Sequence, residues 1–208
     1  MHYYAKSTGG FYDSTIHTTW PEDAVWITDE LHAALLAGQS NGQVIMPGKD
    51  GKPVLASKAP SHLHRWDGKE WTLDKAAASQ LLAEAIDNGT KSINDLVGEA
   101  YRHVTRFGPE YQLREQQAIE YKAGGYKGEL PTQVAAFAEP TGKGGKEATD
   151  IILAQAAKLR ATLEQLGILR MKKLELKNLK TAAEVDKRAA EIVAAIRPHL
   201  QELEKVGK

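Results

Sequence analysis

The spacing of apolar residues changes near residue 73. Before this point, short runs rich in β-branched and aromatic residues alternate with turn dipeptides, whereas after it apolar residues recur every three or four positions. The first pattern is typical of short strands and the second of amphipathic helices. The sequence therefore predicts an α+β protein with two domains. Residues 1–73 would form a small antiparallel β-rich domain with one short helix, and residues 74–208 an all-α helical domain.

Glycine-containing pairs divide the first 73 residues into short segments. Such pairs supply the positive φ angles that tight turns require. The four pairs are Gly9-Gly10, Asn41-Gly42, Asp50-Gly51 and Asp67-Gly68. β-prone runs at 44–46 and 53–55 flank the third pair, and runs at 63–66 and 70–73 flank the fourth. This arrangement predicts a small antiparallel sheet built from hairpins.

One helix is expected to interrupt these strands, over residues 29–37. Thr28 is placed to cap the first turn, and Asp29 and Glu30 suit the positive end of the helix dipole. Gly38 is expected to stop the helix.

Apolar stripes set the phase of the helices after residue 73. The stripes consist of Ile93, Val97, Ala100, Val104 and Phe107, then Ile152, Ala156, Leu159, Leu163 and Leu166, then Val185, Ala189, Ile192 and Ile196. These stripes are compatible with either a compact bundle or an extended arm.

Capping and breaking signals define the helix ends. Ser92 with Asp95 resembles a capping box, and Thr181 with Glu184 forms a full one. Breaks are expected at Asn88-Gly89, Gly124-Gly125 and 142–145, and Pro109 and Pro198 should kink or restart a helix. We therefore expect five or six helices.

Composition narrows the classes of function. Lys plus Arg and Asp plus Glu both number 27, so no global field favours nucleic acid or an anionic membrane. Cysteine is absent, which removes disulfides and thiolate metal sites. The first residues lack the apolar run of a secretion signal, and no stretch is long enough to span a bilayer. We therefore expect the protein in the cytoplasm.

The segment 142–146 is similar to a phosphate-binding loop but lacks the required residues. A Walker loop needs a glycine where this chain has Phe137 or Pro140, and a serine or threonine where it has Gly144 or Glu147. A flexible loop between helices is the favoured interpretation, and no nucleotide is expected.

The other candidate chemistry is weak. His62 and His64 would lie on one face of a strand, but no third metal ligand is near them in sequence, so we predict no metal site. Residues 158–180 hold seven basic and two acidic residues without interleaved aromatics, which favours a solvated helix face over a nucleic-acid site. No catalytic motif is present. We predict no catalytic residues, no cofactor and no enzymatic activity.

Aromatic residues are concentrated at the N-terminal end. All four tryptophans and eight of the 14 aromatic residues precede residue 74. They exceed what a small sheet can bury by itself, so either the core needs rings because it is small, or the rings form a protein-binding face. The two interpretations are compatible. The candidate partner-binding residues are Tyr4, Phe11, Tyr12, Trp20 and Trp26.

The first 60 residues resemble the N-terminal region of phage tail-fibre assembly proteins. The residues that carry this resemblance are Tyr3-Tyr4, 7–13, Ile16-His17, 21–30, 33–39 and 51–55. The C-terminal half resembles a helical segment of phage tail-fibre proteins at 112–118, 123–128, 131–138 and 148–153. Together these segments cover most of the chain, and residues 61–110 match least.

The resemblance implies a chaperone that binds the distal, C-terminal, receptor-binding part of the tail fibre. It would promote folding and trimerisation of the fibre in the host cytoplasm, and some relatives remain on the virion. The expected partner is the trimeric tail-fibre protein, with no nucleic acid, membrane or small-molecule substrate. The alternative is a structural virion component at the fibre tip, either an adaptor or an adhesin-like protein.

Overall fold

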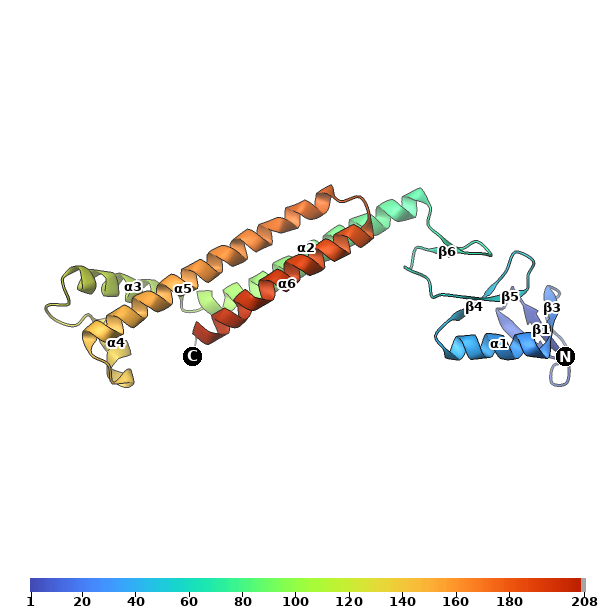
Figure 1. Cartoon of the computed structure of the whole chain (residues 1–208), viewed down its shortest axis with the longest axis horizontal. Helices are drawn as coiled ribbons and strands as arrows, with labels where there is room; N and C mark the ends of the chain where they lie inside the picture. The colour runs from blue at the N-terminus through green and yellow to red at the C-terminus, as the bar shows by residue number, and fades with distance from the viewer. Residues whose placement is uncertain (207–208) are drawn as a thin grey trace. The chain divides into compact units, whose positions relative to one another are not determined.

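The computed structural model describes residues 1–206 and confirms the predicted α+β class. The chain divides into two compact units, one comprising Met1–Leu81 and the other beginning at Leu82. The first unit holds short antiparallel strands and one complete helix, and the second is helical (Figure 1). Helix α2 (Lys75–Thr105) begins two residues after the strand-rich pattern ends and continues into the second unit.

A three-stranded antiparallel sheet opens the first unit. Strand β1 (His2–Ala5) lies between β2 (Gly10–Asp13) and β3 (Ala24–Ile27). The register places Tyr3 opposite Tyr12 on one side and opposite Trp26 on the other. Gly9, with φ +65°, forms the predicted turn between β1 and β2.

Helix α1 (Asp29–Ser40) begins where the sequence predicts. The Leu31 N–H donates to Thr28 Oγ1 at 3.1 Å, which is the expected cap. The prediction that Gly38 stops the helix is wrong, because α1 continues to Ser40. Gly38 is buried, and a Cβ there would overlap the Leu55 side chain. Glycine is needed at this position for close packing, whereas Gly42, with φ +87°, turns the chain after the helix.

Two hairpins complete the first unit. Strands β4 (Val44–Pro47) and β5 (Pro53–Ala56) pair, as do β6 (Arg65–Trp66) and β7 (Trp71–Thr72). Their turns contain Gly51 and Gly68 at positive φ, as predicted.

The prediction that His62 and His64 lie on one face of a strand is wrong. His62 lies in a turn before β6, and His64 is held by a 2.7 Å hydrogen bond between its Nδ1 and Ser61 Oγ. The two imidazoles therefore do not share a strand.

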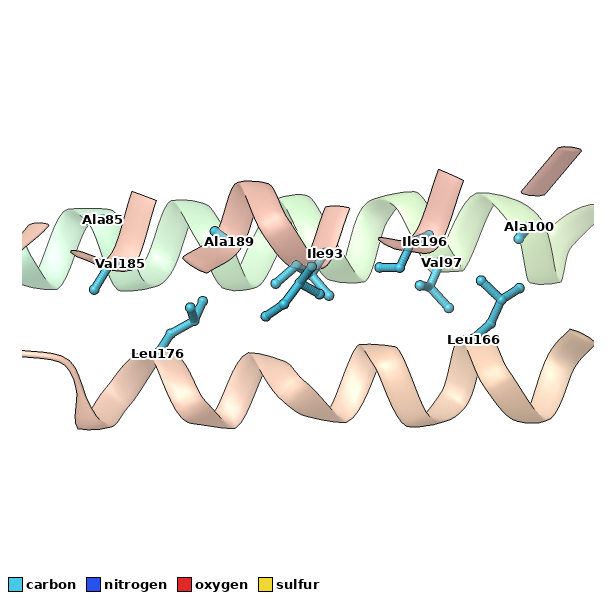
Figure 2. Packing of buried hydrophobic residues seen from close by; sticks show 10 residues of the cluster. Ala85, Ile93, Val97, Ala100, Leu166, Leu176, Val185, Ala189 and Ile196 are labelled. Carbon is cyan, nitrogen blue, oxygen red and sulfur yellow. The ribbon is translucent and has the colours of Figure 1, made fainter. Parts of the chain in front are cut away.

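The second unit contains one core between α2, α5 (Gly145–Met171), the 3-10 helix η1 (Lys172–Asn178) and α6 (Ala182–Val206). Figure 2 shows Leu166 and Leu176 directed toward α2 and α6. The stripe on α6 is confirmed, because all four of its residues are buried. In the first predicted stripe, Ile93, Val97 and Ala100 are buried, whereas Phe107 lies beyond α2 and is exposed.

Helices α3 (Gly108–Ala123) and α4 (Thr132–Thr141) pack near the N-terminal end of α5 (Figure 1). The contacts between these three helices form a second core in this unit, which contains Ala118, Val134, Ala138, Ala148 and Ile152. Helix α5 therefore contributes to both cores of the unit. In the part of the chain that the structure describes, no helix is long and apolar enough to cross a membrane.

Several predicted helix ends are confirmed. Thr181 and Glu184 form a reciprocal capping box, in which the Glu184 N–H donates to Thr181 Oγ1 and the Thr181 N–H donates to Glu184 Oε2. Helix α3 restarts at Gly108 with Pro109 in its first turn, and the breaks at Gly124-Gly125 and 142–145 separate α3 from α4 and α4 from α5.

Two predicted signals inside α2 are wrong. Helix α2 passes without interruption through Asn88-Gly89 and through the supposed start at Ser92. Gly89 is buried, and a Cβ there would lie 3.0 Å from Ala189 Cβ and 3.0 Å from Leu176 Cδ1. The glycine therefore permits close helix packing. At Pro198, where a kink or a restart was predicted, α6 continues without a restart.

Candidate protein-binding site

Side chains of β1 alternate between the two faces of the three-stranded sheet. Tyr4 points into the core beneath α1, where it is fully buried with Ile27 and Leu35. Its ring centroid lies 5.4 Å from that of Phe11, which is half-buried and packs against the same core. Burial raises the pKa of the Tyr4 hydroxyl.

The prediction of Tyr4 as a partner-binding residue is wrong. Its side chain offers no accessible surface, because α1 covers that face of the sheet. Phe11 faces the same side and also contacts His32 of α1, with ring centroids 4.8 Å apart. Phe11 therefore serves mainly to pack the core.

The opposite face of the sheet carries a row of aromatic rings. Tyr3 lies between Tyr12 and Trp26 in the strand register, and Trp20 stacks on Tyr3 with ring centroids 4.8 Å apart and an interplanar angle of 16°. Trp26 is 55% exposed and Trp20 is 38% exposed. We call these four residues the aromatic face. The structure thus brings together three of the predicted residues, Tyr12, Trp20 and Trp26.

Tyr3 is the member that sequence reasoning missed as a site residue. In a strand, neighbouring side chains point to opposite faces, so Tyr3 and Tyr4 cannot both lie in the core. The adjacent pair of tyrosines was itself the signal. It showed that one ring would be buried and one directed outward, but not which one.

Short polar contacts hold the loops beside the aromatic face. The Ser7 backbone N–H and hydroxyl both donate to the Asp23 carboxylate, at 2.8 and 2.7 Å, and thereby join the loop after β1 to the segment before β3. These hydrogen bonds lower the pKa of Asp23. On the other edge, the Tyr12 and Thr8 hydroxyls lie 3.0 Å apart. These hydrogen bonds therefore fix the loops that flank the aromatic face.

An open hollow of about 620 Å³ lies next to Trp26. Its lining residues are Met1, Tyr3, Trp26, Thr28, Asp29 and Glu30. Hydrogen bonds from its own backbone N–H and from the Thr28 hydroxyl lower the pKa of Glu30, and the Asp29 side chain is 81% exposed. The hollow therefore combines an indole surface with the carboxyl groups of Asp29 and Glu30 and with the N-terminal residue Met1.

The remaining two tryptophans have a structural role. The Trp66 indole N–H donates to the Pro47 carbonyl at 2.6 Å, and the Trp71 indole N–H donates to the Ser57 carbonyl at 2.8 Å. Their rings meet edge to face at 5.4 Å. These contacts tie the β6–β7 hairpin to the segment around β4 and β5. Among the eight N-terminal aromatic residues, four therefore serve packing and four form the aromatic face.

Among the side chains that the structure describes, which leave out those at 103, 105 and 204–208, no group of three or more His, Asp or Glu residues is arranged to hold a metal ion. A smaller hollow of about 340 Å³ lies beside His62, Arg65 and Asp74.

Comparisons with known proteins identify phage relatives. Over 125 residues the chain is 35% identical to an uncharacterized 23.3 kDa protein of Haemophilus phage HP1, in an alignment that covers 60% of this chain and 62% of that protein. Over 112 residues it is 30% identical to a probable tail fiber assembly protein of Shigella phage SfV, covering 49% of this chain and 67% of that protein. No family model and no solved structure matches the chain. The chain therefore belongs to a family of phage proteins that includes a probable tail fiber assembly protein.

Proposed function

We propose that this chain is a tail-fibre assembly chaperone that binds the tail-fibre polypeptide through the aromatic face. The observation that carries this proposal is the row of Tyr12, Tyr3 and Trp26 on the sheet surface away from α1, with Trp20 stacked on it. Tryptophan and tyrosine dominate the energetics of protein interfaces because they bury a large area with few rotatable bonds. The name of the Shigella phage relative supports the choice of partner.

A fibre polypeptide needs such a partner for a physical reason. The distal part of a trimeric fibre buries its apolar surface and pairs its strands only when three chains meet, so a lone chain exposes both. A protein that covers this surface until assembly suppresses aggregation and raises the yield of trimer. In this proposal the chain acts in the host cytoplasm by binding and performs no chemistry, while its helical unit serves as a scaffold.

The first prediction concerns co-expression with the tail-fibre protein of the same phage. We expect soluble fibre trimers in amounts that depend on this chain, and a complex detectable by size-exclusion chromatography with mass determination. Replacing Trp20 and Trp26 together with alanine should weaken binding by about 2 kcal/mol or more, because both rings are exposed anchors. That loss corresponds to at least about a 30-fold increase in Kd.

A matched control removes equally exposed apolar surface elsewhere. Ile168 and Met171 are 49% and 50% exposed at the end of α5, so Ile168→Ala with Met171→Ala should leave fibre binding unchanged. Undiminished binding by the double tryptophan variant would show that the aromatic face is not the interface. A fibre that trimerises equally well alone and never binds this chain would refute the chaperone function.

A separate measurement tests the alternative that this chain is a structural component of the virion. Stoichiometric copies of this chain in purified particles, together with fibre trimers that form without it, would favour a structural role at the fibre tip.

A further inference from the structure

Strand β3 has one hydrogen-bonded edge and one free edge. It lies at the end of the sheet order β2-β1-β3 and pairs only with β1. Among residues 1–206, no backbone hydrogen bond joins the other edge of β3 to a second strand. Its four residues, Ala-Val-Trp-Ile, include no proline and no charge, the features that commonly protect an edge strand.

The hydrogen bonds around the sheet identify which groups face this free edge. The Ser14 N–H donates to the Met1 carbonyl at 3.1 Å, so odd-numbered residues of β1 bond toward β2. In an antiparallel ladder alternate residues bond to opposite sides, so His2 and Tyr4 bond toward β3, at Ile27 and Val25. The backbone N–H and C=O of Trp26 therefore point out of the sheet.

Ala24 agrees with this assignment. Its N–H donates to the Pro21 carbonyl at 3.0 Å, in the turn before the strand and not to β1. The free edge thus offers the Ala24 carbonyl, followed by both backbone groups of Trp26.

The opposite edge of the sheet is closed at one of its two outward positions. On β2, Phe11 and Asp13 face outward. The Asp13 N–H donates to His17 Nδ1 at 3.1 Å, and the Asp13 carbonyl accepts from the N–H groups of Ile16 and His17. The chain therefore satisfies the outward groups of Asp13 with its own turn, whereas among the described residues no backbone hydrogen bond is found for the outward groups of Phe11 on β2 or of Trp26 on β3.

The surroundings of Trp26 indicate the character of the missing strand. The hollow is lined by Tyr3 of β1 as well as by Trp26 and Thr28, so it lies on the face of the sheet, and a long side chain from a strand laid along β3 would reach it across the Trp26 ring. Asp29 and Glu30 line it together with Met1, which carries the α-amino group, and the lining includes no lysine, arginine or histidine. A lysine or arginine of the partner, with its apolar stem on the indole, fits both features.

We propose that an extended, basic segment of the tail-fibre protein adds to the free edge of β3 as a further strand. Its backbone bonds to the N–H and C=O of Trp26, and its lysine or arginine side chain lies over the Trp26 ring toward Asp29 and Glu30. Main-chain hydrogen bonds supply affinity in this mode, and the hollow supplies specificity. The inference rests on the proposed function and names its binding mode.

The decisive experiment measures hydrogen exchange at the Trp26 amide, using overlapping peptides of the full chain that isolate residue 26. In the free chain this amide should exchange quickly while Val25 and Ile27 are protected by β1. In the complex with co-expressed fibre protein, it should slow by at least about tenfold. A fibre that binds without slowing this amide overturns strand addition and leaves the chaperone function standing. A fibre that does not bind refutes both.

Two variants at residue 26 separate the ring from the backbone donor. Trp26→Ala removes the ring alone, whereas Trp26→Pro also removes the outward N–H, which edge strands tolerate. We expect the proline variant to bind the fibre roughly fivefold more weakly than the alanine variant. Equal affinities would contradict a bond to this N–H. If the proline variant does not fold, the exchange measurement on the unaltered chain decides.

A charge variant tests the basic character of the segment. Asp29→Asn with Glu30→Gln should weaken fibre binding several-fold and flatten its dependence on salt, since exposed charges are screened. Asp186→Asn, on an exposed position of α6, is the matched control and should change neither. Unchanged affinity and salt dependence in the Asp29/Glu30 variant would overturn the basic-segment assignment.

Discussion

At the residue scale, two glycines of helix α2 serve different purposes. Gly89 is buried against α6 and η1, where an added Cβ would lie closer to neighbouring side chains than ordinary van der Waals contact allows. Gly98 is exposed, and nothing lies within 4 Å of a Cβ at its position. The same residue type therefore stabilises the fold at one site by permitting contact and weakens the helix at the other.

This difference predicts opposite signs for one substitution. Gly89→Leu should lower the free energy of unfolding by about 1–3 kcal/mol or more, because the side chain would force α2 from α6. Gly98→Leu should raise it by about 0.5–1 kcal/mol, because leucine favours the helix more than glycine does. Urea unfolding followed by circular dichroism measures both. A stabilised Gly89→Leu variant would show that the helices can separate without cost.

At the element scale, β1 and α1 meet through a pair of histidines. The His2 and His32 rings stack with centroids 4.0 Å apart, and His32 also meets the Phe11 ring edge to face. Burial lowers the pKa of His32, and His2 lowers it further, while Asp29 and Asp13 act in the opposite direction. The folded first unit therefore favours neutral His32.

This pKa shift predicts that acid weakens the first unit. An unfolded histidine titrates near pH 6.5, so the stabilisation is fully present above about that pH. Below it the unfolded chain binds the proton more readily, and the stabilisation is lost as the pH falls through the lower pKa of folded His32. Tryptophan fluorescence during urea unfolding between about pH 7.5 and 5 measures the loss. His32→Phe keeps a ring on Phe11 and should flatten this dependence, and an unchanged pH profile would contradict it.

At the scale of the whole molecule, spectroscopy distinguishes the two units. All four tryptophans lie in the first unit, whereas most of the helix lies in the second. Tryptophan fluorescence therefore reports the β-rich unit, and far-ultraviolet circular dichroism reports mainly the helical one.

Core truncations should follow this division. Leu35 and Ile192 are each 2% exposed, in the cores of the first and second unit. Leu35→Ala should lower the unfolding free energy seen by fluorescence, and Ile192→Ala that seen by circular dichroism, each by about 2–5 kcal/mol. Urea titrations with both probes test this. If the fluorescence transition of the Leu35→Ala variant were unchanged, Leu35 would not stabilise the core of the first unit.

Several predictions were wrong because the same residue pattern has two physical meanings. Gly38 and Gly89 indicated helix ends, but a glycine also marks a place where a neighbouring element comes close. Tyr4 and Trp26 were both predicted to bind a partner, yet only the strand register shows that α1 covers one and leaves the other exposed. Local patterns carry no information about the neighbour.

The sequence by itself determined the α+β class, the start of α1 at its Thr28 cap, the capping box at Thr181 and the buried stripe on α6. These follow from local hydrogen bonding and from the period of apolar residues, which act within a few positions of the chain. Only the tertiary structure decided which aromatic rings reach the surface and that the Trp26 backbone faces a free edge. Those outcomes depend on segments far apart in sequence, because burial and strand pairing are properties of the assembled sheet.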